Sequence, residues 1–309
     1  MKKQTFWHVV MEVCFFIQTP YVAKINFDFM LYSDLIRYEN GFSGSRHEVT
    51  TINFNNSKRC FVENKVNVNR SVVFFFILLV VAYIPVFMKE QILDAFVRED
   101  RIYETLSPIY LFVASIMFGI AFYRSPIKLK LKDPAWLKRL SFLAFCVLFL
   151  LATMEEISWG QRIFGVETPN LIKDVNVQKE LTFHNLNIFQ GEDAKLPLDF
   201  DQLSAIFALT FGFLIPAACR FIAPLKKFLD NKFPILPLLF GLLFPVNYLI
   251  QKTLMRVLPI FPALFQHPNM KFPQAVYEVR EHNYAMLLMA SAVLYILLKL
   301  DLGNEKPVS

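Results

Sequence analysis

The chain has 309 residues, of which 55% are hydrophobic and only 19% are charged, and 34 of them are phenylalanine. A soluble domain of this length carries more charge and fewer long apolar runs, so the composition excludes an ordinary soluble protein. The formal net charge of +6 comes from basic residues that gather in short loops between apolar runs, which favours a membrane topology over nucleic-acid binding.

Residues 1–70 differ from the rest of the chain. The apolar stretch Phe6–Ile17 is short and is interrupted by Glu12, so it is a weak candidate for a signal peptide. Asn26–Asn69 is polar and rich in asparagine, serine and charged residues. We expect a loosely ordered cytoplasmic extension with a short interfacial helix; the alternative is that this stretch lies upstream of the true coding start.

Six apolar runs follow, and each is close to the length of about 20 residues that a helix needs to cross about 30 Å of hydrocarbon. Their side chains do not alternate in the way that the strands of a membrane β-barrel require. The sequence therefore predicts an all-α, polytopic bundle of six transmembrane helices over residues 71–301, with residues 302–309 as a short tail. The predicted spans are Val72–Met88, Leu106–Tyr123, Leu140–Trp159, Leu203–Ile222, Ile235–Ile250 and Tyr284–Leu300.

The lysines and arginines of the short loops set the orientation, because cytoplasmic loops carry an excess of them. With six spans, the three basic loops fall on one side, which places both termini in the cytoplasm. The segments on the outer side are then Lys89–Thr105, Gly160–Gln202 and Gln251–Asn283. The basic residues are Lys58, Arg59, Lys65, Arg70, Arg124, Lys128, Lys130, Lys132, Lys138, Arg139, Lys226, Lys227 and Lys232.

Unusual polar residues gather at the outer ends of the spans. The stretch TMEEISWGQRIF (Thr153–Phe164) ends the third run with two adjacent carboxylates. Ionisable residues near membrane depth are costly, so their presence indicates a site. Two further outer segments carry similar residues, and the candidates are Glu155, Glu156, His184, Asn185, Glu278, Glu281, His282 and Asn283.

Two of these segments share the pattern E-x3-H-N, at Glu180–Asn185 and at Glu278–Asn283. On a helix, residues four apart lie on one face, so each glutamate would reach its histidine. We predict that His184 and His282 are ligands of a divalent metal such as zinc, or proton carriers, and that Glu180 and Glu278 orient them.

Glu156 would be the general base, a choice over its neighbour Glu155 that is close to even, because adjacent helical residues point about 100° apart. Glu155 would instead pair with a basic residue or point to the headgroups. The competing interpretation is that glutamates and histidines at a membrane interface only cap helices and form hydrogen bonds.

Other candidates have weaker support. Ser158 lacks the G-x-S-x-G surroundings of a nucleophilic serine. Gln161 and Arg162 follow it, and Arg162 either clamps an anionic headgroup or, as we favour, pairs with a glutamate. Trp159 is typical of the interfacial aromatic belt, and Asn247 could bond across helices. The four cysteines are scattered and form no CxxC, which indicates neither a disulfide framework nor a thiolate metal site.

Four stretches of the core have distinctive sequences: REDRIYETLSPIYLFVAS (Arg98–Ser115), MEEISWGQRIFGVETP (Met154–Pro169), NVQKELTFHNL (Asn176–Leu186) and EVREHNYA (Glu278–Ala285). Through them the chain from about Asn69 to Leu300 resembles a group of uncharacterised bacterial integral membrane proteins. The second stretch, of the form EExSWGQR, is the most specific. The resemblance implies a multi-pass protein of the bacterial inner membrane and implies no particular activity.

A looser analogy is with the alkaline ceramidase-like membrane hydrolases, which hold zinc with serine, aspartate and three histidines in a seven-helix bundle. This chain has six runs, its acids are mostly glutamate, and only two histidines are well placed. The analogy therefore concerns chemistry and not membership.

These observations favour a periplasm-facing site for metal-assisted or acid–base hydrolysis or transfer on a lipid or lipid-linked substrate. Membrane lipids are the expected partners, and no nucleic acid is expected. One alternative is a transporter or ion-coupled membrane component, although transport sites usually lie nearer the midplane. The other is a non-catalytic scaffold, in which the polar residues lock the outer loops together. The sequence alone predicts no oligomeric state.

Overall fold

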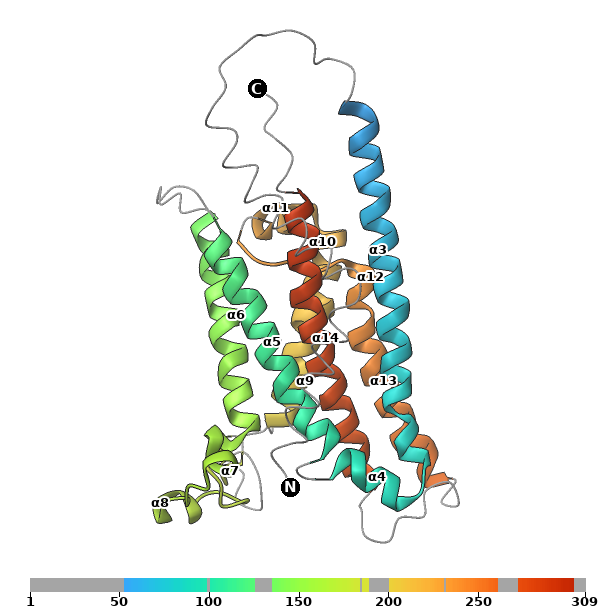
Figure 1. Ribbon diagram of the computed structural model, residues 1–309. Coiled ribbons are helices and arrows are strands. Elements are labelled where there is room, and N and C mark those ends of the chain that lie inside the picture. Colours follow the sequence, from blue (N-terminus) through green and yellow to red (C-terminus); the bar gives the residue numbers. More distant parts are fainter. Residues whose placement is uncertain are drawn as a thin grey trace, which may run out of the picture. The chain divides into compact units, whose positions relative to one another are not determined.

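The computed structural model describes residues 53–98, 101–125, 135–183, 185–188, 200–230, 232–260 and 272–302 (Figure 1). The chain divides into two compact units, Met1–Ser57 and Lys58–Ser309, and the description below concerns the second. Most of the predicted N-terminal extension, residues 1–52, and the tail after Leu302 lie outside the described residues. Residues 53–70 are helical, so the first membrane helix begins well before the predicted Val72.

The described residues are helical apart from loops, and they contain no strand beyond an isolated bridge between Asn176 and Leu186. Five helical segments are long and apolar enough to cross a membrane, and they coincide with the first five predicted runs. The prediction of an all-α, polytopic helical bundle is therefore confirmed. These segments are Val68–Phe87, Glu90–Arg124, Trp136–Glu156, Phe200–Phe221 and Leu238–Ile260.

The first half of the chain supplies three long helices and a small group of short ones. They are α3 (Asn53–Ala82), the 3-10 turn η1 (Ile84–Phe87), α4 (Glu90–Val97), α5 (Ile102–Arg124) and α6 (Ala135–Glu156), followed by η2 (Ser158–Gly160), α7 (Gln161–Phe164) and α8 (Asn170–Lys173). Pro85 at the first turn of η1 fits the position where a missing N–H costs least.

The second half is more broken and ends in the longest helix. It contains α9 (Phe200–Leu209), the π-helical turn η3 (Thr210–Leu214), α10 (Ile215–Phe221), α11 (Ala223–Leu229), α12 (Leu238–Gly241), α13 (Leu243–Val257), η4 (Leu258–Ile260) and α14 (Phe272–Leu302). The sixth predicted run lies in α14, which begins at Phe272 instead of Tyr284 and so carries charged residues in its first half.

Two glycines explain why the chain packs closely at η3. A Cβ on Gly212 would overlap the ring of Phe244, and a Cβ on Gly241 would overlap the carbonyl oxygen of Gly212. Glycine at both positions lets the π turn lie directly against α12 and α13. A π turn inside a membrane helix frees backbone groups and bends the helix locally.

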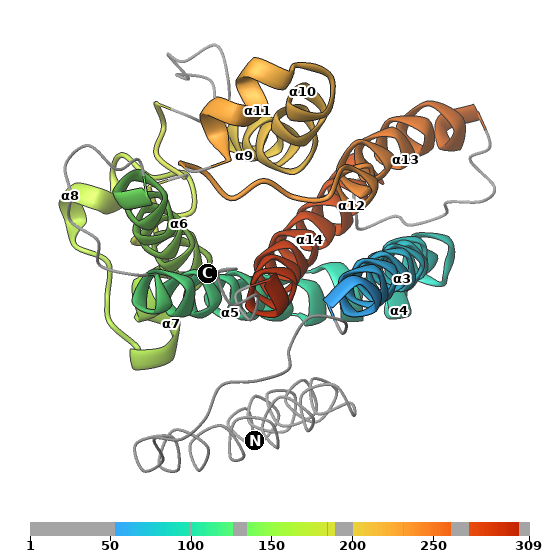
Figure 2. The same cartoon turned by 90° about the horizontal axis from the view of Figure 1, so that it is seen from above.

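Helix α14 lies among the other helices, packing against α5 and α13 along its length and against α4 and α9 near its start (Figure 2). Its buried side chains run from Ala275 to Tyr295. Helices α3 and α6 instead expose large apolar side chains such as Ile77 and Leu151, as lipid-facing helices do.

The aromatic core lies between α5, α6 and α9–η3 and uses many of the phenylalanines. Phe118 stacks on Phe145 at 5.1 Å between ring centroids, and Phe145 contacts Phe211 at 4.8 Å. These rings lie toward the basic-loop end of the helices, which the topology predicts to be cytoplasmic. We call the opposite end, where α6 ends and α9 and α14 begin, the outer end.

Candidate functional site

The stretch that ends α6 makes a left-handed turn at the outer end. Three consecutive residues have positive φ, with Ser158 at 49°, Trp159 at 53° and Gly160 at 77°. Glycine adopts this conformation freely, but each of the other two costs about 1–2 kcal/mol. Such strain persists only where surrounding contacts determine it, and it is often found at functional sites.

Two carboxylates hold the turn in place. The Ser158 hydroxyl donates to Glu180 Oε2 at 2.6 Å, and the Trp159 indole donates to Glu155 Oε1 at 2.5 Å. Glu155 Oε2 also accepts the backbone N–H of Phe183 at 2.8 Å. Glu155 is nearly buried at 9% exposure, and its bonds to Trp159 and Phe183 tie the end of α6 to the following loop. The sequence predicted neither of these contacts: Glu155 was expected to pair with a basic residue or point to the headgroups, and Glu180 to orient His184.

The rest of this loop, residues 161–188, is built on amide side chains. Asn176 Oδ1 accepts the N–H of Gln178 at 3.0 Å, and Asn185 Nδ2 donates to Gln178 Oε1 at 2.7 Å. Gln161 Oε1 accepts the N–H of Leu181 at 2.8 Å. The bonds to Asn176 and Gln161 satisfy backbone N–H groups outside a helix, and the Asn185–Gln178 bond joins two side chains, which explains a turn-rich loop here.

The helical interpretation of Glu180–Asn185 is therefore wrong. Lys179 has φ of 58°, and the described residues of this segment form bends and turns. Glu180 and His184 thus do not share a helix face as the E-x3-H-N pattern predicted. His184 and the side chain of Arg162 lie outside the described residues, so their predicted roles stay predictions.

A second group of polar residues lies where α14 begins. Arg280 is buried at 3% exposure, and its Nη2 pairs with Asp201 of α9 and lies 3.5 Å from Glu281 Oε1. Its guanidinium also lies over the Tyr277 ring, 5.0 Å from the centroid. A buried arginine needs such partners, because an uncompensated charge away from water costs several kcal/mol.

Carboxylates from three helices interact at this point, and we call Glu156, Asp201, Glu278 and Glu281 the outer carboxylate cluster. Asp201 and Glu281 lie at Arg280, and the charges of the other two act on Glu281. Removal from water raises the pKa of Glu281 well above its usual range, and a hydrogen bond to Asp201 adds to this effect. The negative charges of Glu278, Asp201 and Glu156 raise it further. Like charges that gather in one site disfavour ionisation, so the protonated form of Glu281 is favoured relative to an isolated glutamate.

His282 faces away from this cluster, toward α5. Its ring lies 4.2 Å from that of Tyr103 and 5.4 Å from that of Tyr110, measured between centroids. Burial lowers the pKa of His282 to about 4, against a hydrogen bond to the Tyr103 backbone. The imidazole is therefore neutral at pH 7.

Glu278 and His282 share α14 as predicted, but Glu278 does not bond the ring at Nδ1. That nitrogen is buried and has no hydrogen-bond partner. The ring is held by aromatic packing instead, because α5 covers this face of α14. Within the described residues, no three side chains of the metal-binding types are grouped as ligands. The zinc prediction also depends on His184 and stays a prediction.

Further polar residues lie deeper between α3, α13 and α14, and they include the predicted site residue Asn283 and Asn247, whose predicted bond across helices is confirmed. The Tyr83 hydroxyl donates to Asn247 Oδ1 at 2.9 Å, and Asn283 Nδ2 donates to the same oxygen at 3.1 Å. Asn247 Nδ2 donates to the Arg280 carbonyl at 3.0 Å. Gln251 lies one helical turn from Asn247 and is fully buried. We call Tyr83, Asn247, Gln251, Asn283 and Tyr284 the inner polar network.

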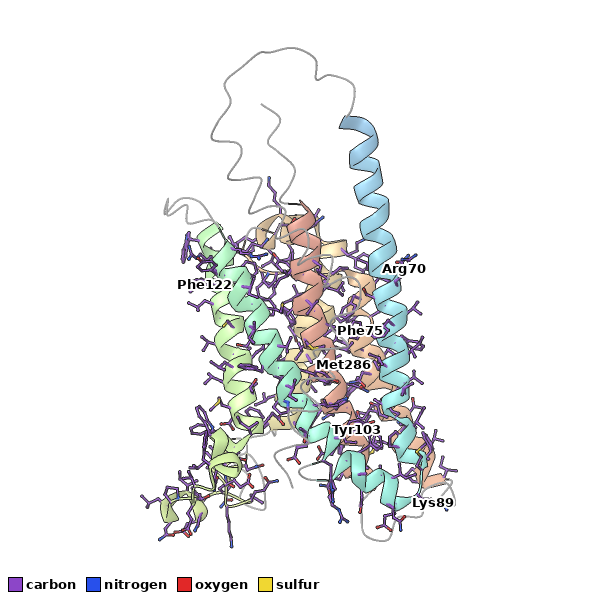
Figure 3. The ribbon with its side chains drawn as sticks, in the orientation of Figure 1. Arg70, Phe75, Lys89, Tyr103, Phe122 and Met286 are labelled. Atoms are coloured by element: carbon purple, nitrogen blue, oxygen red, sulfur yellow. The ribbon has the colours of Figure 1, made fainter. Side chains whose placement is uncertain are left out.

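In the described part of α14, the buried polar side chains that contact other helices end at Tyr284. Along α14 after Tyr284, buried residues such as Met286, Leu287 and Leu294 are apolar, and Ser291 donates to the carbonyl of Leu287 in its own helix. Figure 3 shows Tyr103 on the Lys89 side of Met286, with Phe122 toward the opposite end. In the described part of the chain, the site is therefore polar at the outer end and closed by apolar side chains beyond it.

Two signals in the sequence pointed to Gln251 and Arg280, which the predictions did not include. Asn247 and Gln251 are spaced four apart in an apolar run, which places both on one helix face. Arg280 is a lone arginine entering a membrane helix, and such a charge requires a partner.

Comparisons with protein-family models, with curated proteins and with solved structures find no match for this chain. Its function is therefore argued from its own residues.

Proposed function

We propose that this multi-pass protein is an enzyme of the bacterial inner membrane that carries out acid–base hydrolysis or transfer on a lipid or lipid-linked substrate at the outer face. The observation that supports this is the geometry of the outer carboxylate cluster, in which Asp201 pairs with the buried Arg280 and Glu281 lies 3.5 Å from the same guanidinium. Neighbouring carboxyl groups whose pKa values are pushed apart form an acid and a base at the same pH.

The cluster offers the two proton transfers that such a reaction needs. Protonated Glu281 would donate its proton to the leaving-group oxygen as the bond to it breaks. Glu156, which is exposed, would accept a proton from the attacking water or hydroxyl. The Arg280 guanidinium pairs with Asp201 and lies 3.5 Å from Glu281 Oε1, so it holds both carboxyl groups at one place. Each proton-transfer group of this kind contributes about 10²–10⁴-fold to a rate.

An amphiphilic substrate suits the surroundings of the cluster. The loop beside it exposes large apolar side chains, among them Phe164 at 78% and Leu171 at 85%. Exposed apolar groups of this kind mark contact with membrane or with apolar ligands. A substrate held in the outer leaflet would reach the carboxylates with its polar group while its chains stay in lipid.

The transporter alternative has less support, because transport needs a polar path through the bundle. The inner polar network ends at Tyr284, and apolar side chains follow it on α14. The scaffold alternative fits Glu155, Ser158, Gln161 and Glu180, whose hydrogen bonds hold the outer loop together. It does not explain why the charges of three other carboxyl groups act on Glu281 beside a buried arginine.

The proposal is tested with full-length protein in vesicles of bacterial lipids that include a glycolipid, with mass spectrometry of the released headgroups and chains. Glu281→Gln and Glu156→Gln should each lower turnover at least about 100-fold. Glu167→Gln, an exposed carboxylate of the same outer segment, should leave turnover unchanged. Wild-type turnover in Glu281→Gln would contradict the acid role. Loss of turnover on chelation, restored by zinc, would support the metal-assisted version with His184 and His282.

A further inference from the structure

The inner polar network contains polar atoms that are buried and have no hydrogen-bond partner. Both amide atoms of Gln251 are unpartnered, as are Asn283 Oδ1, the Tyr284 hydroxyl and the Arg280 Nε. None of these four residues is more than 4% exposed. Most buried polar groups in proteins are hydrogen-bonded, so a concentration of unpartnered ones indicates that something else satisfies them.

These atoms belong to one place in the bundle. Asn247 contacts both Asn283 and the Arg280 backbone, which fixes α13 against α14 at this level. Gln251 follows Asn247 by one turn on the same face of α13, toward the outer end. The Tyr284 ring stacks on that of Phe244 at 6.2 Å between centroids, so its hydroxyl also belongs to the α13–α14 contact.

The network adjoins the outer carboxylate cluster through Arg280. The guanidinium of this residue pairs with Asp201, while its Nε is left over on the inner side. A ligand bonded to the network would therefore lie next to Glu281. This arrangement is that of a recognition subsite beside a reacting centre, and it rests on the function proposed above.

The chemistry of the unpartnered atoms selects the ligand class. Gln251 Oε1 and Asn283 Oδ1 accept hydrogen bonds, whereas Gln251 Nε2 and Arg280 Nε donate them, and the Tyr284 hydroxyl does both. An anion would meet the two oxygens and the nearby carboxylates, and a cation would meet Arg280. A hydroxyl group both donates and accepts without charge.

We propose that the inner polar network binds a neutral polyhydroxyl group, either the sugar or glycerol headgroup of a lipid or a free sugar. A hydroxylated ligand would satisfy the amide of Gln251 and the hydroxyl of Tyr284 together. Sites built to hydrogen-bond hydroxyls reject analogues that lack them, because their buried polar groups then stay unpaired.

The test measures binding to the full-length protein in nanodiscs. The probes are a glucosyl diacylglycerol in the nanodisc, free glucose, and phosphatidic acid as an anionic lipid without a hydroxylated headgroup. Gln251→Met keeps the length of the side chain and removes its hydrogen bonds. Gln274→Met, at an exposed position of α14, is the matched control. Thermal melting of each variant without probe is measured alongside.

We expect glucosyl diacylglycerol to bind, and Gln251→Met to weaken its binding about tenfold, the equivalent of one or two hydrogen bonds. Gln274→Met should bind as the wild type does, and phosphatidic acid should show no dependence on Gln251. Without probe, Gln251→Met should melt no lower than Gln274→Met, because it removes an unpaired buried amide. Glucose binding that is weakened equally by Gln251→Met would support the same site with a free sugar as its ligand.

Three results would overturn the subsite. These are the failure of both sugar probes to bind, equal affinity in Gln251→Met, or a clear loss of stability in Gln251→Met that shows its amide to be structural. The proposed enzyme function fails separately, through unchanged turnover in Glu281→Gln. Turnover that depends on Glu281, with a KM that is unchanged in Gln251→Met, would reject the subsite and leave the function in place.

Discussion

Lowering the pH from 7 to 5 should destabilise the wild-type protein by about 2 kcal/mol more than it destabilises a His282→Phe variant. The pKa of His282 is about 4 in the folded protein and 6.5 in an unperturbed histidine. At pH 5 the unfolded chain binds a proton on this imidazole and the folded chain does not. Stability therefore falls as the pH drops through 6.5 toward 4, at about 1.4 kcal/mol per pH unit.

The wild type has to be compared with His282→Phe because Glu281 changes the stability in the opposite direction as the pH falls. Its pKa is raised above the ordinary 4.5, so the folded chain keeps a proton that the unfolded chain loses, and stability grows as the pH falls. Phenylalanine at 282 keeps an aromatic ring against Tyr103 and Tyr110 but cannot titrate.

The assay is denaturation in detergent micelles at pH 5, 6 and 7, followed by circular dichroism. The free energy of unfolding of the two proteins should diverge progressively as the pH falls. Parallel pH dependence in wild type and His282→Phe would refute the reasoning, since it would mean that the imidazole takes up its proton equally in both states.

Four further substitutions, at three positions, test the outer loop and the inner polar network by the same denaturation assay. Ser158→Ala should lower the free energy of unfolding by about 1.5–3 kcal/mol, because it breaks a buried hydrogen bond to Glu180. Ser158→Gly should lower it by about 1 kcal/mol less than Ser158→Ala does, because glycine relieves the positive φ. Equal losses in the two variants would argue against strain. Gly160→Ala should cost about 1–2 kcal/mol, since its φ is 77° and a Cβ would lie 2.9 Å from Phe164 Cε2, and wild-type stability would contradict that geometry. Asn247→Leu should cost about 2 kcal/mol through three lost interhelical bonds, and a neutral result would mean that these bonds are not formed.

The sequence predicted the helices well because their signal is local. A run of about 20 apolar residues has few alternatives to a membrane helix, since every backbone group must be satisfied within lipid. Five of the six predicted runs are candidate membrane-spanning helices in the structure, and the sixth lies in α14. The start of α3 at Asn53 was missed because its first turns are polar and give no hydropathy signal.

The site was harder to predict because its contacts join distant parts of the chain. The pairing of Arg280 with Asp201 and of Ser158 with Glu180 depends on tertiary packing that no local pattern contains. The E-x3-H-N repeat suggested two equivalent helical units. The second lies on α14, whereas residues 180–183 of the first lie in a loop in which the Asn176 side chain accepts the backbone N–H groups of Gln178 and Glu180.

The choice between Glu155 and Glu156 illustrates what periodicity does provide. Adjacent helical residues face different directions, so the two carboxylates were expected to differ. In the structure Glu155 accepts bonds from Trp159 and the Phe183 backbone, and Glu156 is exposed and close enough to Glu281 to raise its pKa. The spacing alone does not predict which residues each of the two carboxylates contacts.

The most direct test of the central claim is whether Glu281 is protonated at pH 7. Infrared difference spectroscopy of the full-length protein between pH 7 and pH 10 reports the carbonyl stretch of a protonated carboxylic acid. We predict a band at pH 7 that disappears at high pH and is absent in Glu281→Gln, while Glu167→Gln retains it. A spectrum without that band at pH 7, or one that is unchanged in Glu281→Gln, would contradict the assignment of Glu281 as the acid of the site.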